Sequence, residues 1–169
     1  MSTFIKQIIW NQFGASVDTL ENAIKHCPDK VWGDKPGFHE FWYIAYHTLF
    51  FLDFYMSETD KNFAPPKPFT LGELDPAGVL PDRVYTKAEL LKYLEYGREK
   101  SRKVINALTD EKSMQPCGFE RKDFTVAELY ISNMRHNQHH AAQLNLLLRQ
   151  KIDSAPKWVS QTKHKLMEE

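Results

Sequence analysis

The stretch FWYIAYHTLFFLDFY, residues 41–55, decides the fold class. It is apolar almost all round, which is typical of a helix that is buried on most sides. His47 and Asp53 interrupt it, and it is shorter than the roughly 20 apolar residues that a membrane-spanning helix needs. With its flanks, this stretch predicts a buried helix over residues 38–57.

Three further stretches place apolar residues at helical spacing. The first covers residues 3–26 and ends at Cys27-Pro28, because proline cannot continue the hydrogen-bond ladder. The other two begin near residues 86 and 125, each with a threonine followed three residues later by a glutamate, which is the capping-box pattern. Strand signals are almost absent. The sequence therefore predicts an all-α, four-helix bundle.

We expect one domain over residues 1–169, with a core over about 3–150 and a polar C-terminal tail over 151–169 that drapes over the bundle or frays. Residues 58–85 are rich in proline and glycine and form a long crossover loop between helices two and three. A loop of this length inside a compact domain is usually functional, so we expect it to form a wall of a pocket. On the third helix, Arg98 belongs to a charged set that is predicted mostly to face water.

The charge balance argues against nucleic acid as a partner. Lysine plus arginine equals aspartate plus glutamate at 22 each, and no basic run offers phosphate contacts. No stretch predicts membrane insertion, and the N-terminus lacks the pattern of a signal peptide. The two cysteines, Cys27 and Cys117, are predicted to be free thiols in a reducing compartment, so we expect a cytoplasmic protein.

The last helix carries RHNQHHAAQL at residues 135–144, and its three histidines differ in direction. At about 100° per residue, His136 and His140 share one face, whereas His139 falls on the flank. Two imidazoles at this spacing can bind one metal ion, as in the HExxH zinc motif, but Asn137 stands where that motif has glutamate. Asn133, Asn137 and Gln143 make the inner face of this helix polar over two to three turns, which a bundle built only for stability would avoid.

His47 is the best candidate for a third ligand, since it lies in the middle of the aromatic second helix. Taken alone, it fits equally well a buried histidine that hydrogen-bonds a carbonyl or a tyrosine. Three histidines without a fourth protein ligand would leave coordination positions open, as in catalytic zinc sites, and imidazoles suit zinc, nickel, copper or iron. A di-iron carboxylate site is disfavoured because no pair of Glu-x-x-His motifs is present.

His47 in YIAYHTLFFLDFY, with His136, His140 and Gln143 in RHNQHHAAQLNLLL, resembles the DinB-like (YfiT-type) superfamily over roughly residues 3–150. The resemblance implies an up-down-down-up bundle that often forms homodimers, and a histidine triad that binds a divalent metal, most often zinc or nickel. It also implies thiol S-transferase chemistry with low-molecular-weight thiols such as bacillithiol, or mycothiol-dependent isomerisation. Ala141-Ala142 replace the Arg-Gly step that family members often carry, which puts the specific thiol chemistry in doubt.

Two functions follow as hypotheses. The first is a metal-dependent enzyme of the thiol S-transferase type, with His47, His136 and His140 as metal ligands and a small-molecule substrate. Its further contacts to the metal ligands or the substrate would come from Asn133, Asn137 and Gln143, with Tyr43 and Asp53 as weaker candidates. The second is a non-enzymatic dimeric bundle whose metal site is structural or vestigial.

Overall fold

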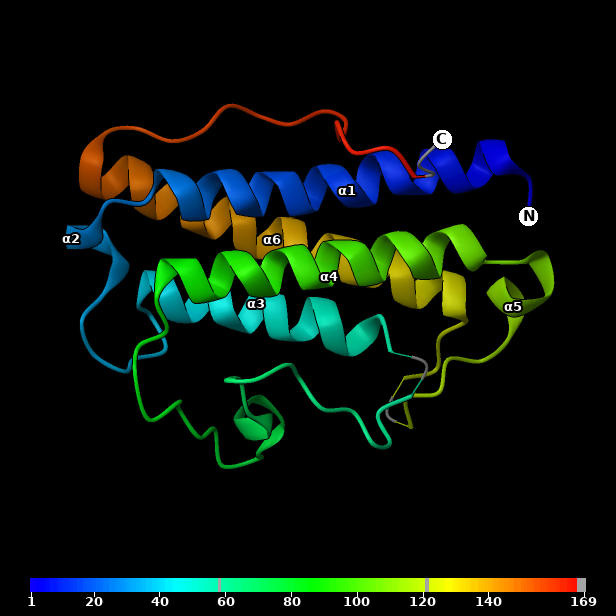
Figure 1. Cartoon of the computed structure of the whole chain (residues 1–169), viewed down its shortest axis with the longest axis horizontal. Coiled ribbons are helices and arrows are strands. Elements are labelled where there is room, and N and C mark those ends of the chain that lie inside the picture. Colours follow the sequence, from blue (N-terminus) through cyan, green and yellow to red (C-terminus); the bar gives the residue numbers. More distant parts are fainter. Residues whose placement is uncertain (58, 121, 167–169) are drawn as a thin grey trace.

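The computed structural model describes residues 1–57, 59–120 and 122–166 (Figure 1). Four long helices form a bundle: α1 (Thr3–His26), α3 (Phe41–Tyr55), α4 (Lys87–Ala107) and α6 (Val126–Ile152). Short helices lie in the connections: α2 (Asp29–Trp32), η1 (Leu71–Leu74) and α5 (Asp110–Met114). Within the described ranges the only β pairing is two isolated bridges. The all-α, four-helix prediction is confirmed.

The four helices surround one core. α1 and α3 each contact both α4 and α6, so the order around the bundle is α1, α6, α3, α4. α1 and α6 run in one direction and α3 and α4 in the other (Figure 1). The parallel pair α3 and α4 is joined by the crossover over residues 56–86, which passes along the outside of α3 before it returns to the start of α4. This is the up-down-down-up order that the family resemblance implied.

The helix boundaries follow the capping chemistry. Both predicted capping boxes form, at Thr86 with Glu89 and at Thr125 with Glu128. The second helix is shorter than the predicted 38–57, because Glu40 has an extended backbone and the helix begins only at Phe41. The two capping boxes define the first residue of α4 and of α6.

The crossover explains why α3 is apolar on most sides. The ring of Phe69, from the crossover, stacks on Tyr93 of α4 with centroids 4.3 Å apart and on Tyr46 of α3 at 5.7 Å. Tyr85 packs against the same Tyr46 at 4.8 Å. α3 is therefore covered by the bundle on one side and by the crossover on the other.

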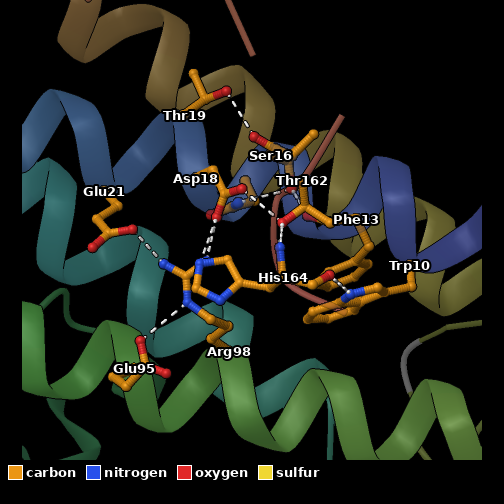
Figure 2. A network of polar contacts seen from close by, with 12 residues as sticks. Trp10, Phe13, Ser16, Asp18, Thr19, Glu21, Glu95, Arg98, Thr162 and His164 are labelled. Atoms are coloured by element: carbon orange, nitrogen blue, oxygen red, sulfur yellow. Dashed lines mark hydrogen bonds and ion pairs between the residues drawn. The ribbon is translucent and has the colours of Figure 1, made fainter. Parts of the chain in front are cut away.

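The prediction that Arg98 faces water was wrong. Its side chain is 1% exposed, and its guanidinium pairs with Asp18 and, at 2.5 Å, with Glu21, both on α1 (Figure 2). Glu95, one turn earlier on α4, lies 3.1 Å from its Nε. Gly97, the residue before it, faces α3, where an added Cβ would lie 3.0 Å from Leu52, whereas the Arg98 side chain reaches the acidic residues of α1.

The C-terminal tail drapes along α1, one of the two outcomes that the sequence predicted (Figure 1). The indole Nε1 of Trp10 donates to the carbonyl oxygen of His164 over 2.7 Å, and the backbone N–H of Thr162 donates to the carbonyl of Asn11 over 3.1 Å. The Thr162 hydroxyl donates to Asp18 over 2.6 Å, which ties the tail to the Arg98 cluster (Figure 2).

No helix in the described part of the chain has the length and apolar character that crossing a membrane requires. Cys27 and Cys117 are both free, as predicted.

Candidate metal centre

Three imidazoles meet where α3 packs against α6. The ring centroids of His136 and His140 are 4.5 Å apart, and the ring of His47 lies 4.9 Å from that of His140 and 5.5 Å from that of His136. Each ring offers one nitrogen, and the three nitrogens lie within 4.8 Å of one another. The predicted convergence of these three histidines is therefore present.

Hydrogen bonds on the far side of two rings decide which nitrogens face each other. Nδ1 of His47 lies 2.7 Å from the Glu73 carboxylate, and Nδ1 of His140 lies 2.6 Å from the side-chain oxygen of Gln143. An oxygen acceptor holds the proton on Nδ1 and leaves Nε2 with a free lone pair, which is how metal-bound histidines are oriented. Nε2 of His140 accordingly faces Nε2 of His136 at 3.1 Å.

Burial favours the neutral imidazole at His136 and His140. Burial lowers the pKa of His136 to about 3, and the neighbouring His140 and His47 add to this effect. Burial also lowers the pKa of His140. The neutral ring is the form that ligates metals, so near neutral pH the nitrogens of His136 and His140 are ready to bind a cation without first losing a proton.

Aromatic side chains line the inner side of the triad. The Phe51 ring lies 4.8 Å from that of His47 and 5.6 Å from that of His136, and the Tyr55 ring lies 6.5 Å from that of His136. These rings exclude water from one side of the three nitrogens. A charge placed there is screened weakly, which strengthens its interaction with the lone pairs.

The residues present fit a divalent metal ion. Four nitrogens around a tetrahedral zinc at about 2.0–2.1 Å would lie about 3.3 Å from one another, close to the 3.1 Å that separates the two facing Nε2 atoms. Nδ1 of His136 is buried without a hydrogen-bond partner. Unlike His47 and His140, this ring therefore has no oxygen acceptor at Nδ1, and its Nε2 is the nitrogen that faces the other two rings.

The three predicted polar neighbours lie in different places. Gln143 contacts His140, but Asn133 donates to the carbonyl of Leu52 over 3.1 Å and Asn137 donates to the Ser16 hydroxyl over 2.9 Å. Asn133 and Asn137 each come three residues before a histidine of the triad. Three residues turn a helix by about 300°, so the two asparagines lie about 60° around α6 from His136 and His140. Both amides thus bind the bundle interior, and a role for them toward a ligand stays a prediction.

Tyr43 and Asp53, the two weaker candidates, also lie in different parts of the fold. Tyr43 lies one turn before His47, and its ring is 6.3 Å from that of His47. Asp53 is fully buried on the α4 side, where it accepts from the Tyr93 hydroxyl over 3.0 Å and from Lys100 over 2.5 Å. Tyr43 therefore belongs to the site, and Asp53 belongs to a structural ion pair.

Sequence reasoning missed Glu73. It lies in η1 within the crossover, its side chain is 2% exposed, and no motif or spacing connects it with His47, 26 residues earlier. The crossover was predicted to form a wall of the pocket, but none of its residues lines the pocket beside the triad. It reaches the triad instead from behind, through Glu73 on His47.

A pocket of about 480 Å³ opens beside the triad, between α3 and α6. His47 and His140 form part of its wall, so one side of the triad is accessible to a small molecule. Three ligands and an accessible side are the arrangement of catalytic rather than structural zinc sites.

A second cluster of possible ligands does not fit a metal. Asp18, Glu21 and His164 also bring one ligand atom each within 4.8 Å. The guanidinium of Arg98 already pairs with both carboxylates, so the place of a cation is taken by a side chain (Figure 2).

The DinB superfamily profile matches residues 12–144, which is most of the 169-residue chain and includes all three histidines. The match confirms the resemblance predicted from the histidine motif. Searches of curated proteins and of solved structures return no match to this chain.

Proposed function

The chain belongs to the DinB superfamily, and on that premise we propose that it is a metal-dependent enzyme of the thiol S-transferase type. His47, His136 and His140 would hold a divalent ion, with zinc or nickel as the best candidates for three imidazole ligands. The single observation that carries the proposal is the convergence of three imidazoles beside an open pocket.

When bound, such an ion supplies Lewis acidity, which lowers the pKa of a coordinated thiol so that the thiolate predominates near neutral pH. The protein's own groups provide the rest. Glu73 and Gln143 orient two of the rings through Nδ1, and Phe51 excludes water from the inner side. Burial, together with the nearby Glu73, raises the pKa of Tyr43, so a protonated phenol stands at the pocket wall as a hydrogen-bond donor.

The thiol in this proposal is a small molecule rather than a cysteine of the chain. Neither Cys27 nor Cys117 lines the pocket beside the triad. Burial raises the pKa of the Cys27 thiol to about 12, so this group is not a thiolate at neutral pH. A homodimer in the cytoplasm, which the sequence and the family resemblance led us to expect, remains part of the proposal.

The test begins with elemental analysis of untagged protein, comparing wild type with His136→Ala and with His139→Ala as the matched control. His139 is exposed and lies outside the triad. We expect one divalent ion per chain in the wild type and in the control, and almost none in His136→Ala, with unchanged helicity. Equal metal content in all three proteins would refute the metal site.

Activity separates the enzyme from the structural alternative. We expect turnover of a chloroaromatic or epoxide electrophile with added thiol, its loss on chelation and its recovery with zinc or nickel. If chelation instead lowers the melting temperature strongly and no thiol-dependent turnover is found at any metal loading, the site is structural.

A further inference from the structure

The residues that line the pocket beside the triad indicate which kind of ligand it binds. α3 supplies its residues around His47, α6 supplies its residues around His140, and the turn before α3 closes one end. The complete lining is Phe38, His39, Tyr43, Ile44, His47, His140, Gln143, Leu146 and Leu147. Among these, the polar side chains are His47, His140 and Gln143 of the candidate metal centre, together with His39 and the hydroxyl of Tyr43.

The remaining wall is mainly apolar. Phe38 and Tyr43 meet edge to face with ring centroids 5.3 Å apart and form an aromatic corner. Leu146 is 53% exposed and Phe38 is 48% exposed, so the mouth of the pocket presents large apolar side chains to water. A ligand that covers them gains the free energy of removing apolar surface from water. A concave apolar wall with a few convergent polar groups is the usual form of a small-molecule site.

No lysine, arginine, aspartate or glutamate is among the lining residues. A carboxylate or phosphate on the body of the ligand, away from the proposed ion, would thus lose its hydration without a lysine or arginine to pair with. The Glu73 carboxylate lies behind His47, where one of its oxygens is buried without a hydrogen-bond partner. In the metal-free protein, a negative charge in the pocket would also be repelled by this carboxylate.

We propose that this pocket binds a small molecule whose body is uncharged and apolar, with an aromatic ring as the best fit, and whose thiol head points to His47 and His140. The inference rests on the proposed function for the thiol head, but the preference for an uncharged body comes from the pocket wall alone. It excludes thiols whose body carries several carboxylates as the preferred ligand of this chain.

The experiment uses two matched probe pairs. Benzyl mercaptan and para-(mercaptomethyl)benzoate share head and ring and differ by one carboxylate, and they are titrated calorimetrically into zinc-loaded protein. Benzyl alcohol and para-(hydroxymethyl)benzoate are titrated into metal-free protein. We expect the uncharged member of each pair to bind at least about tenfold more tightly, the size of effect that one unpaired buried charge produces.

Leu146→Arg places a cation at the pocket mouth, and Ile131→Arg is its control, because Ile131 is 51% exposed on the same helix and outside this pocket. Leu146→Arg should narrow or reverse the preference between the paired probes, and Ile131→Arg should leave it unchanged. The inference would be overturned if the wild type bound the charged and uncharged members of a pair with equal affinity. It would also be overturned if Leu146→Arg and Ile131→Arg reduced the affinity ratio between them equally. It would also be overturned if Leu146→Arg split a dimer and left the probe preference intact, because the mouth would then be covered by a second copy.

The two proposals fail in different ways. Protein that binds no zinc but still prefers benzyl alcohol would refute the proposed function and support the apolar pocket. Zinc-dependent thiol turnover with equal affinity for the charged and uncharged probes would support the function and refute the apolar pocket.

Discussion

A carboxylate oxygen of Glu73 lies 2.7 Å from Nδ1 of His47, although the two residues come from different segments, 26 positions apart. The bond joins the crossover to the centre of α3. It fixes the imidazole so that Nε2 is directed to the other two histidines, as carboxylate partners do for metal-bound histidines. The long crossover therefore contributes to the metal centre through one buried side chain.

Glu73→Ala should lower zinc affinity by about 10–100-fold, because the His47 ring loses the partner that sets its orientation and tautomer. Glu73→Gln keeps an oxygen acceptor and should recover part of this loss. Competition with a chromophoric chelator measures both. Asp75→Asn is the control from the same segment, since Asp75 is exposed and its carboxylate accepts from the backbone N–H of Ala77, away from the triad. Affinities that do not differ among the three variants would show that Glu73 has no positioning role.

The fold was predictable because its signals are local. The apolar run of α3, the threonine–glutamate pairs at the starts of α4 and α6 and Pro28 after α1 each act within a few residues of chain. The spacing of His136 and His140 is local in the same sense, because helix geometry alone puts them on one face.

The rest of the site depends on contacts between distant segments. Glu73 has no regular pattern around it, and its partner is known only once the crossover folds back over α3. Arg98 was misassigned for a related reason, because its burial depends on Asp18 and Glu21, which lie 80 and 77 positions earlier. Helical periodicity detects apolar stripes but gives no signal for a buried ion cluster.

Arg98→Met should destabilise the bundle by about 3–5 kcal/mol, because it leaves the buried Asp18 carboxylate without its cation. Glu95→Gln removes another partner of Arg98, but the Glu95 side chain is 55% exposed, so we expect a change below about 1 kcal/mol. Urea unfolding of both variants gives the comparison. Adding Asp18→Asn to Arg98→Met should restore part of the loss, and a purely additive double variant would argue against a coupled pair.

The start of α4 should contribute stability that depends on pH. Hydrogen bonds from Arg83 and from the Thr86 backbone lower the pKa of Glu89 from 4.5 to about 2. The folded chain thus binds this proton less readily than the unfolded chain, so the contribution is complete above pH 4.5 and is lost as the pH falls toward 2. Glu89→Gln keeps the capping geometry without the charge and should melt about 2 °C lower at pH 7, a small effect because the pair is solvent-exposed. The difference in melting temperature between wild type and Glu89→Gln should disappear near pH 2. A difference that stays constant between pH 7 and pH 2 would contradict the assignment.

The two cysteines should differ in reactivity. Burial raises the pKa of the Cys27 thiol to about 12, and Cys27 is 1% exposed, whereas Cys117 is half-buried. Iodoacetamide at pH 8 should therefore modify Cys117 in the native protein and reach Cys27 only after unfolding. Peptide mass mapping of the two sites checks this order. Rapid native labelling of Cys27 would reopen the question of a thiolate supplied by the chain itself.

Gly14 determines how closely the tail can lie on α1. A Cβ atom at this position would stand 2.7 Å from the Thr162 methyl carbon, a distance at which something must shift. Gly14→Ala should therefore push the tail off the helix and break the bonds that Thr162 makes with Asp18 and Asn11. Trypsin should then cleave after Lys157 and Lys163 faster than in the wild type, while the bundle itself stays resistant. Gly37→Ala is the matched control, since its Cβ would meet only the Glu40 side chain. If trypsin cleaves the tail of both variants at the wild-type rate, the position of Thr162 does not depend on the missing side chain at Gly14. The bond between Trp10 and His164 would then be enough to hold the tail in place.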